Sequence, residues 1–163
     1  MYDAAVVSKV AGAPGKSVLP GDVAARPLPA TATEPFRIAL VDDDPLVRQA
    51  LVRVLQARDV AVVAFASAED LLADSAWRDF SCLLLDLHLP GMSGPELARQ
   101  AAAAGVETPT IFISGAPAAS ISWEMTALGS DAVVLIKPID AELLRDTVQC
   151  ACAAARSRPS GTA

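Results

Sequence analysis

Five polar residues of this chain follow apolar runs, at positions where they could carry out phosphoryl chemistry. Asp42 and Asp43 come after one such run, and Asp86 follows three leucines in the stretch LLLDLHLPGMSG. Ser114 and Lys137 each close a later apolar run. Carboxylates that lie together raise one another's pKa unless a cation joins them. Because hard oxygen ligands suit Mg²⁺, which takes one or two carboxylates and a phosphate oxygen, we expect Mg²⁺ among these aspartates.

The three aspartates are expected to divide two tasks. Asp42 and Asp43 would hold the metal ion, with the backbone carbonyl of His88 as a candidate further ligand. Asp86 would contact the same ion and act as the nucleophile, because a carboxylate can attack a phosphoryl group to form an acyl phosphate.

Negative charge that develops on the phosphoryl group during such a transfer must be stabilised by cations and hydrogen-bond donors. The ammonium of Lys137 and the hydroxyl of Ser114 would supply these beside the metal ion. Gly115 follows the serine and would leave room for the phosphoryl group.

The apolar runs predict the elements that must bring these residues together. From Phe36 onwards they alternate with helical patterns, and each is nearly continuous, as is typical of a parallel strand covered on both faces. The predicted strands are residues 36–41, 60–65, 82–87, 110–114 and 132–137. They predict a doubly wound α/β sandwich, a five-stranded parallel sheet with helices on both faces. Ligands of such a sheet bind outside the carboxyl ends of the strands, where the five polar residues stand.

Three helix starts are marked by residues that can accept a backbone N–H. Asp44 is followed by Pro45 and is expected to cap a helix rather than bind a ligand. Ser67 precedes Asp70 by three residues, which resembles a capping box, and Asp140 opens the last helix.

Length and charge exclude several classes of protein. A chain of 163 residues fits one domain with tails. Its net charge of −6 disfavours binding to nucleic acid or an anionic membrane surface. No apolar run approaches the roughly 18 residues of a membrane span. Three cysteines with a single histidine favour neither a disulfide framework nor a zinc site, and the N-terminus lacks the basic region of a secretory signal. The cytoplasm is therefore the expected location.

The two ends of the chain differ from its middle. Residues 1–35 collect prolines and small residues without periodicity and are expected to form a disordered leader. The domain is expected over residues 36–156 and a disordered tail over residues 157–163. The leader segment GAPGKS looks like part of a P-loop, but that motif needs a glycine where this chain has Val10.

Taken together, the segments VDDDP, LLLDLHLPGMSG, ISG and KP resemble the receiver domain of bacterial two-component response regulators, the CheY-like superfamily. The resemblance covers roughly residues 36–156. It implies a flavodoxin-like fold with strand order 2-1-3-4-5. It also implies that Asp86 accepts a phosphoryl group, with Mg²⁺ as cofactor, and that the peptide bond between Lys137 and Pro138 is cis.

The partners follow from the same resemblance. The phosphoryl donor would be a sensor histidine kinase or a histidine phosphotransfer protein, and the signal would pass to a downstream protein target. The domain would be no enzyme apart from catalysing its own phosphorylation and dephosphorylation. It would act as a monomer or as a homodimer that forms on phosphorylation.

One position departs from the family pattern. Receivers usually carry Tyr or Phe three residues before the lysine, and this chain has Val134 there. In the family that ring turns inward as the serine or threonine hydroxyl moves onto the phosphoryl group. The switch pair here would be Ser114 and Val134, which has no ring to turn. We expect the phosphoryl chemistry to survive and output to depend on loop and backbone shifts.

Two other classes of function stay open at this point. Val134 motivates a protein-binding module that works independently of phosphorylation. A phosphohydrolase with an aspartyl intermediate would normally carry a second carboxylate two residues after the nucleophile. This chain has His88 there, so sustained turnover of phosphate esters is not expected.

Overall fold

The computed structural model describes residues 36–56, 60–117, 120–121 and 132–157. The predicted leader over residues 1–35 lies outside the described residues, as does the predicted tail over residues 157–163 except for Ser157, which is the last residue of a helix. Across the described part, every helix falls short of the length and apolar character that crossing a lipid bilayer requires.

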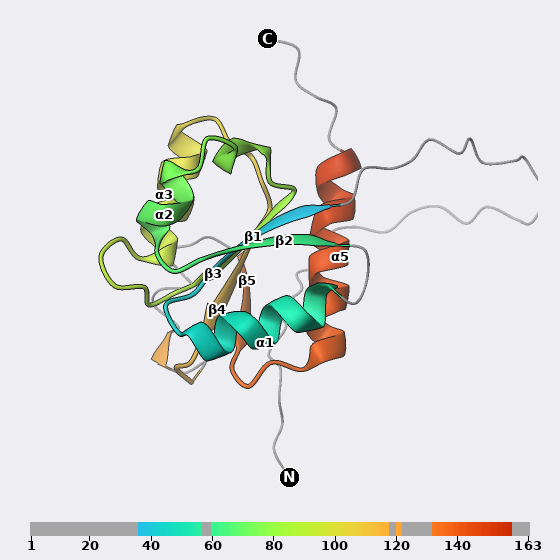
Figure 1. The fold of residues 1–163 in the computed structure, drawn as a ribbon. Helices are drawn as coiled ribbons and strands as arrows, with labels where there is room; N and C mark the ends of the chain where they lie inside the picture. Colours follow the sequence, from blue (N-terminus) through green and yellow to red (C-terminus); the bar gives the residue numbers. More distant parts are fainter. Residues whose placement is uncertain (1–35, 57–59, 118–119, 122–131, 158–163) are drawn as a thin grey trace, which may run out of the picture.

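A five-stranded parallel sheet forms the centre of the domain (Figure 1). Its strands are β1 (Arg37–Val41), β2 (Ala61–Phe65), β3 (Cys82–Asp86), β4 (Thr110–Ser114) and β5 (Val133–Ile136). Their order is β2-β1-β3-β4-β5, and every neighbouring pair is parallel. The predicted fold class and strand order are confirmed. Because β1 and β3 are neighbours, the residues that follow them leave the sheet side by side.

Three predicted strands were one residue too long and the last was two residues too long, because an apolar run indicates burial rather than strand pairing. Leu87 was placed in the third strand, and the strand ends at Asp86. Leu87 is nevertheless buried, and its N–H donates to the carbonyl of Ile113 at 2.8 Å. Lys137 likewise lies just past β5, and its N–H donates to the carbonyl of Ser114 at 2.8 Å.

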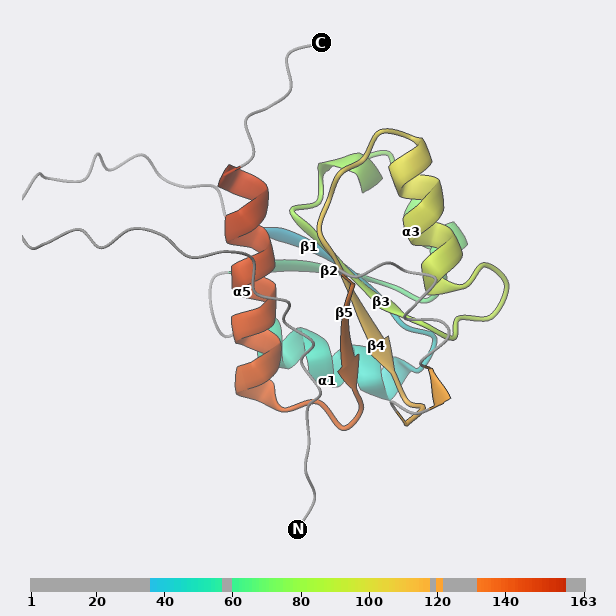
Figure 2. The ribbon, with the colours of Figure 1, turned by 180° about the vertical axis from the view of Figure 1, so that it is seen from behind.

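Helices cover both faces of the sheet (Figures 1 and 2). The helical elements are α1 (Pro45–Gln56), α2 (Ala68–Ala73), the 3₁₀ turn η1 (Trp77–Asp79), α3 (Gly94–Ala103) and α5 (Ala141–Ser157). Helices α1 and α5 pack on one face and α2 and α3 on the other, so alternate strand residues enter two separate apolar clusters. In β1, Ile38 and Leu40 face α1 and α5, while Ala39 and Val41 face the opposite side.

The predicted helix caps are confirmed. Asp44 Oδ1 accepts the N–H groups of Leu46 at 2.8 Å and Val47 at 3.3 Å. Ser67 Oγ accepts the N–H of Asp70 at 3.1 Å. Asp140 Oδ1 accepts two N–H groups at the start of α5, both at 2.9 Å.

A further cap was missed, although its sequence pattern was visible. Ser93 and Glu96 form a reciprocal capping box at the start of α3. The same hydrogen bonds lower the pKa of Glu96. Ser93 closes the loop after Asp86, so this box fixes where that loop ends.

Candidate functional site

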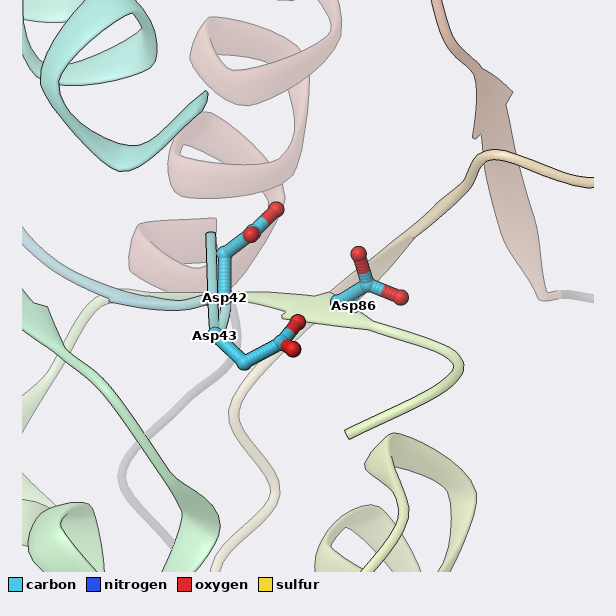
Figure 3. A group of neighbouring side chains, drawn as sticks. All are labelled: Asp42, Asp43 and Asp86. Carbon is cyan, nitrogen blue, oxygen red and sulfur yellow. The ribbon is translucent and has the colours of Figure 1, made fainter. Parts of the chain in front are cut away.

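The structure brings the three predicted aspartates together where β1 and β3 end (Figure 3). Asp42 and Asp43 directly follow β1, and Asp86 is the last residue of β3. One carboxylate oxygen from each residue lies within 4.8 Å of the other two. Asp42 and Asp86 are buried, whereas Asp43 is exposed. The cluster is therefore open to solvent through Asp43.

Lys137 follows β5, which is separated from β3 by β4, and its side chain reaches this cluster. Its ammonium donates to Asp42 Oδ2 at 2.8 Å and to Asp86 Oδ2 at 2.5 Å. One cation thus bridges two carboxylates that come from different strands. The peptide bond from Lys137 to Pro138 is cis, as the resemblance implies.

Burial and ion pairing set the protonation of this group. Burial raises the pKa of Asp42 above its usual range, although the hydrogen bond from Lys137 opposes the shift. Burial alone would lower the pKa of Lys137, but the hydrogen bonds to Asp42 and Asp86 outweigh it and raise that pKa. The lysine therefore stays charged at neutral pH, and a further cation near Asp42 would offset the cost of its buried negative charge.

The raised pKa of Lys137 predicts a loss of stability at alkaline pH. Its stabilising contribution is fully present below its ordinary pKa of 10.5 and is lost as pH rises through the higher pKa of the folded state. The difference in free energy of unfolding between wild type and Lys137→Met should therefore be flat around neutral pH and shrink above about pH 10.5. Urea unfolding across this range measures it, and a difference that grew with pH would contradict the expectation.

The turn that carries the first two aspartates is held by α1. The N–H of Asp44 donates to Asp42 Oδ1 at 2.9 Å. The guanidinium of Arg48 donates to the backbone carbonyl of Asp42 at 2.5 Å. Sequence reasoning missed Arg48, because its role depends on the helix bringing it back over the turn where it begins.

Ser114 and Gly115 lie at the end of β4. Ser114 is buried, and its hydroxyl oxygen accepts the N–H of Ala116 at 3.1 Å. A Cβ added at Gly115 would meet no atom of the described residues within 4 Å, which leaves space beside it. Both residues lie at the same edge of the sheet as the carboxylate cluster. Their roles toward a phosphoryl group stay predictions.

The loop after Asp86 orients the carboxylate. The backbone N–H of His88 donates to Asp86 Oδ1 at 2.8 Å, while the His88 side chain is exposed. Glu69 at the start of α2 accepts the N–H of Met92 at 3.1 Å and so holds the far part of this loop. That the His88 carbonyl binds a metal ion stays a prediction.

Gly94 allows α3 to begin close to the site. A Cβ at this position would collide with the backbone carbonyl oxygen of Asp86. A glycine is therefore required here, because the backbone at Gly94 lies so close to the backbone of Asp86. The sequence motif could not reveal this contact between two segments.

Gly94→Ala is expected to lower the free energy of unfolding by about 1–3 kcal/mol, because the added methyl group must push α3 away from Asp86. Urea unfolding measures the change. The control is Ala98→Gly, which also lies in α3 and should lower the free energy of unfolding by only about 1 kcal/mol. Gly105→Ala is not a suitable control, because the positive φ of Gly105 would strain an alanine. Unchanged stability in Gly94→Ala would contradict the expected collision.

The donor set fits a hard divalent cation. Three carboxylates from Asp42, Asp43 and Asp86 offer oxygen ligands within reach of one ion, and one of them faces solvent. With one ammonium against three carboxylates, the cluster also keeps an excess of negative charge for such an ion to neutralise.

Comparisons with known proteins agree with this arrangement. Residues 38–149 match the family model described as the response regulator receiver domain. The response regulator receiver protein CpdR of Brucella abortus is 37% identical over 115 residues, which cover 69% of this chain and 90% of that protein. The C4-dicarboxylate transport transcriptional regulatory protein DctR of Rhodobacter capsulatus is 39% identical over 82 residues, which cover 49% of this chain and 42% of that protein.

Solved structures show the same fold. The signal receiver domain of an HD domain-containing protein from Pseudomonas fluorescens Pf-5 matches with a TM-score of 0.68 at 24% identity, over 76% of this chain and 99% of that chain. At this identity the likeness concerns the fold alone. The chain spans about half the length or less of the first curated relatives that it matches.

Proposed function

This chain belongs to the family of response regulator receiver domains, and from that premise we propose that it accepts a phosphoryl group on Asp86 and signals through protein contacts. The observation that carries the proposal is the placement of the Asp86 carboxylate. It lies 2.5 Å from the Lys137 ammonium, within 4.8 Å of two further carboxylates that could share a metal ion.

The proposed transfer needs little besides positioning and charge stabilisation. A carboxylate oxygen of Asp86 forms a bond to phosphorus while the bond from phosphorus to the donor nitrogen or oxygen breaks. The donor keeps that electron pair, and a histidine donor whose other ring nitrogen carries a proton leaves as neutral imidazole. The N–H of His88 and the ammonium of Lys137 each hold one oxygen of Asp86 before the reaction, which fixes the direction of attack.

Mg²⁺ is the proposed cofactor, held by Asp42, Asp43 and Asp86, with the His88 carbonyl as a further ligand. When bound, it would neutralise charge that develops on the phosphoryl oxygens. Lys137 would move from the Asp86 carboxylate toward the new phosphoryl group. The hydroxyl of Ser114 would donate its hydrogen to that group, because its oxygen only accepts in the bond with the Ala116 N–H.

The proposed donor is a sensor histidine kinase or a histidine phosphotransfer protein, and the proposed recipient of the signal is a downstream protein. Membership of the receiver family supports both partners. We place the domain in the cytoplasm, in keeping with the reduced state of Cys82, Cys150 and Cys152. It would act as a monomer or as a homodimer that forms on phosphorylation, without binding nucleic acid or membrane directly.

Val134 bears on how the signal leaves the site. It pairs with Phe112 across β4 and β5 and packs in the apolar cluster under α2 and α3, with 8% of its surface exposed. A packed valine has no ring to rotate, so we propose that Ser114 and the loop after it carry the switch through backbone shifts. The same observation supports a second candidate, a protein-binding module that ignores phosphorylation. Equal partner affinity before and after phosphorylation would favour that candidate.

The proposal is tested by incubating the full chain with acetyl phosphate and Mg²⁺ and measuring its intact mass. We expect one phosphoryl group per chain, no addition when EDTA removes the metal, and release by hydroxylamine, which cleaves acyl phosphates. Peptide mapping after borohydride reduction should place the modification at Asp86. Absence of the adduct, or its location on another residue, would overturn the proposal.

A further inference from the structure

A small cavity lies at the edge of the sheet opposite the carboxylate cluster. Its volume is about 110 Å³, and its apolar walls come from Phe36, Leu55, Val60 and Val148. Phe36 and Val60 directly precede β1 and β2, so the cavity opens at the amino ends of these strands, between α1 and α5. Nothing in the phosphoryl chemistry described above uses this edge.

One cation faces this cavity. Arg145 and Gln149, one turn apart on α5, supply the polar part of its lining. Arg145 is half-buried, and its guanidinium forms no hydrogen bond or ion pair with any of the described residues. Within the described part of the chain this partly buried guanidinium has lost hydration without gaining a polar contact, and an anionic group at this position would compensate for that loss.

We propose that the cavity binds a small aromatic carboxylate, with its ring among the apolar walls and its carboxylate on Arg145. The volume allows no more than a single ring, since a larger dry apolar cavity of about 150 Å³ holds one benzene. The ring of Phe36 offers an aromatic wall, and the planar guanidinium of Arg145 can hold a carboxylate through two parallel hydrogen bonds.

Shape and charge favour this occupant over a protein partner. A stable protein interface buries on the order of 800 Å² on each side, whereas this feature is a recess with room for one ring. The chain as a whole carries a net charge of −6 and repels anions, so an anion would bind only where a local cation such as Arg145 offsets that repulsion.

The cavity also touches a buried contact between α5 and β3. Cys152, which lines it, hydrogen-bonds with Cys82 at the start of β3, and this bond together with burial raises the pKa of the Cys82 thiol. A bound ligand would add contacts among α1, α5 and the starts of these strands. Because the unfolded chain lacks the cavity, binding should raise the midpoint of thermal unfolding.

The test titrates the full chain with benzoate, followed by isothermal calorimetry and by two-dimensional amide NMR. We expect one site with a dissociation constant of about 1 mM, a value suited to so small a ligand. Benzamide, which has the same shape without the charge, should bind at least about tenfold more weakly. Amide shifts should concentrate on α5 and on the residues that precede β1 and β2.

Variants separate the charge from the cavity. Arg145→Gln should weaken benzoate binding at least about tenfold. The control is Arg99→Gln, which removes an exposed arginine from α3 and should leave the affinity for benzoate unchanged. Val60→Phe should fill the recess and abolish binding. Because Arg145 is only half-buried, its variant is expected to fold even if Val60→Phe does not.

Three results would overturn the proposal. One is no saturable benzoate binding up to about 20 mM. Another is equal affinity for benzoate and benzamide, or equal affinity in wild type and Arg145→Gln. The third is that the chain self-associates and does not bind benzoate, and that Val60→Phe removes the self-association. This result would assign the face to a second copy of the chain.

Discussion

Asp86→Asn is expected to lower phosphoryl uptake from acetyl phosphate by at least about 10³-fold, to the limit of detection by intact mass. The reason is chemical, because an amide has no oxygen lone pair nucleophilic enough to attack phosphorus at neutral pH. The substitution keeps the shape of the side chain. It also removes a negative charge from a cluster in which one ammonium faces three carboxylates.

The same variant should remain folded. Lys137 keeps its ion pair with Asp42 at 2.8 Å, so the free energy of unfolding without Mg²⁺ is expected to stay within about 1 kcal/mol of wild type. Asp79→Asn, an exposed carboxylate in η1, is the matched control and should take up phosphate normally. Uptake by Asp86→Asn at the wild-type rate would assign the acceptor to another residue.

Lys137→Met is expected to show two large effects with different responses to Mg²⁺. Without the ammonium, Asp42 and Asp86 become two buried carboxylates with no bridging cation. The free energy of unfolding should then fall by about 2–3 kcal/mol, less than for a fully buried pair because the lysine side chain is 23% exposed. The rate of phosphoryl uptake should fall by about 10²–10³-fold, as when one transition-state donor is lost.

Saturating Mg²⁺ separates these two effects. A divalent ion on the aspartates should restore most of the lost stability, because it replaces the missing positive charge, yet it should leave the rate low. Urea unfolding and a time course of intact mass measure the two quantities. Arg99→Met, which removes an exposed cation from α3, is the control and should change neither. Recovery of the rate by Mg²⁺ alone would show that Lys137 acts only by neutralising its neighbours.

The site was predictable because its residues stand at strand ends. Each strand is short and apolar, so the position where Asp86 or Ser114 interrupts the run also marks the edge of the sheet. Parallel strands place such ends on one side, which is why residues 95 positions apart, Asp42 and Lys137, could be expected to meet. Side chains that cap helices were predictable for a similar reason, because their partners lie within three residues.

The missed residues act across space rather than along the chain. Arg48 reaches the carbonyl of Asp42, Glu69 holds the N–H of Met92, and Gly94 lies against the carbonyl of Asp86. Each of these contacts depends on the angle at which a helix crosses the sheet, and no local pattern encodes that angle. The cavity beside Arg145 was missed for the same reason, because its walls come from α1, from α5 and from the residues that precede β1 and β2.

The pairing of β1 with β3 has a consequence for how relatives of this protein could diverge. Val41 lies opposite Leu85, so the next residues, Asp42 and Asp86, inherit their separation from main-chain hydrogen bonds that no side chain can retune. Substitutions on outer helix surfaces can therefore accumulate without disturbing that spacing. Changes on those outer surfaces could alter protein docking while the distance between the two acidic side chains stays the same.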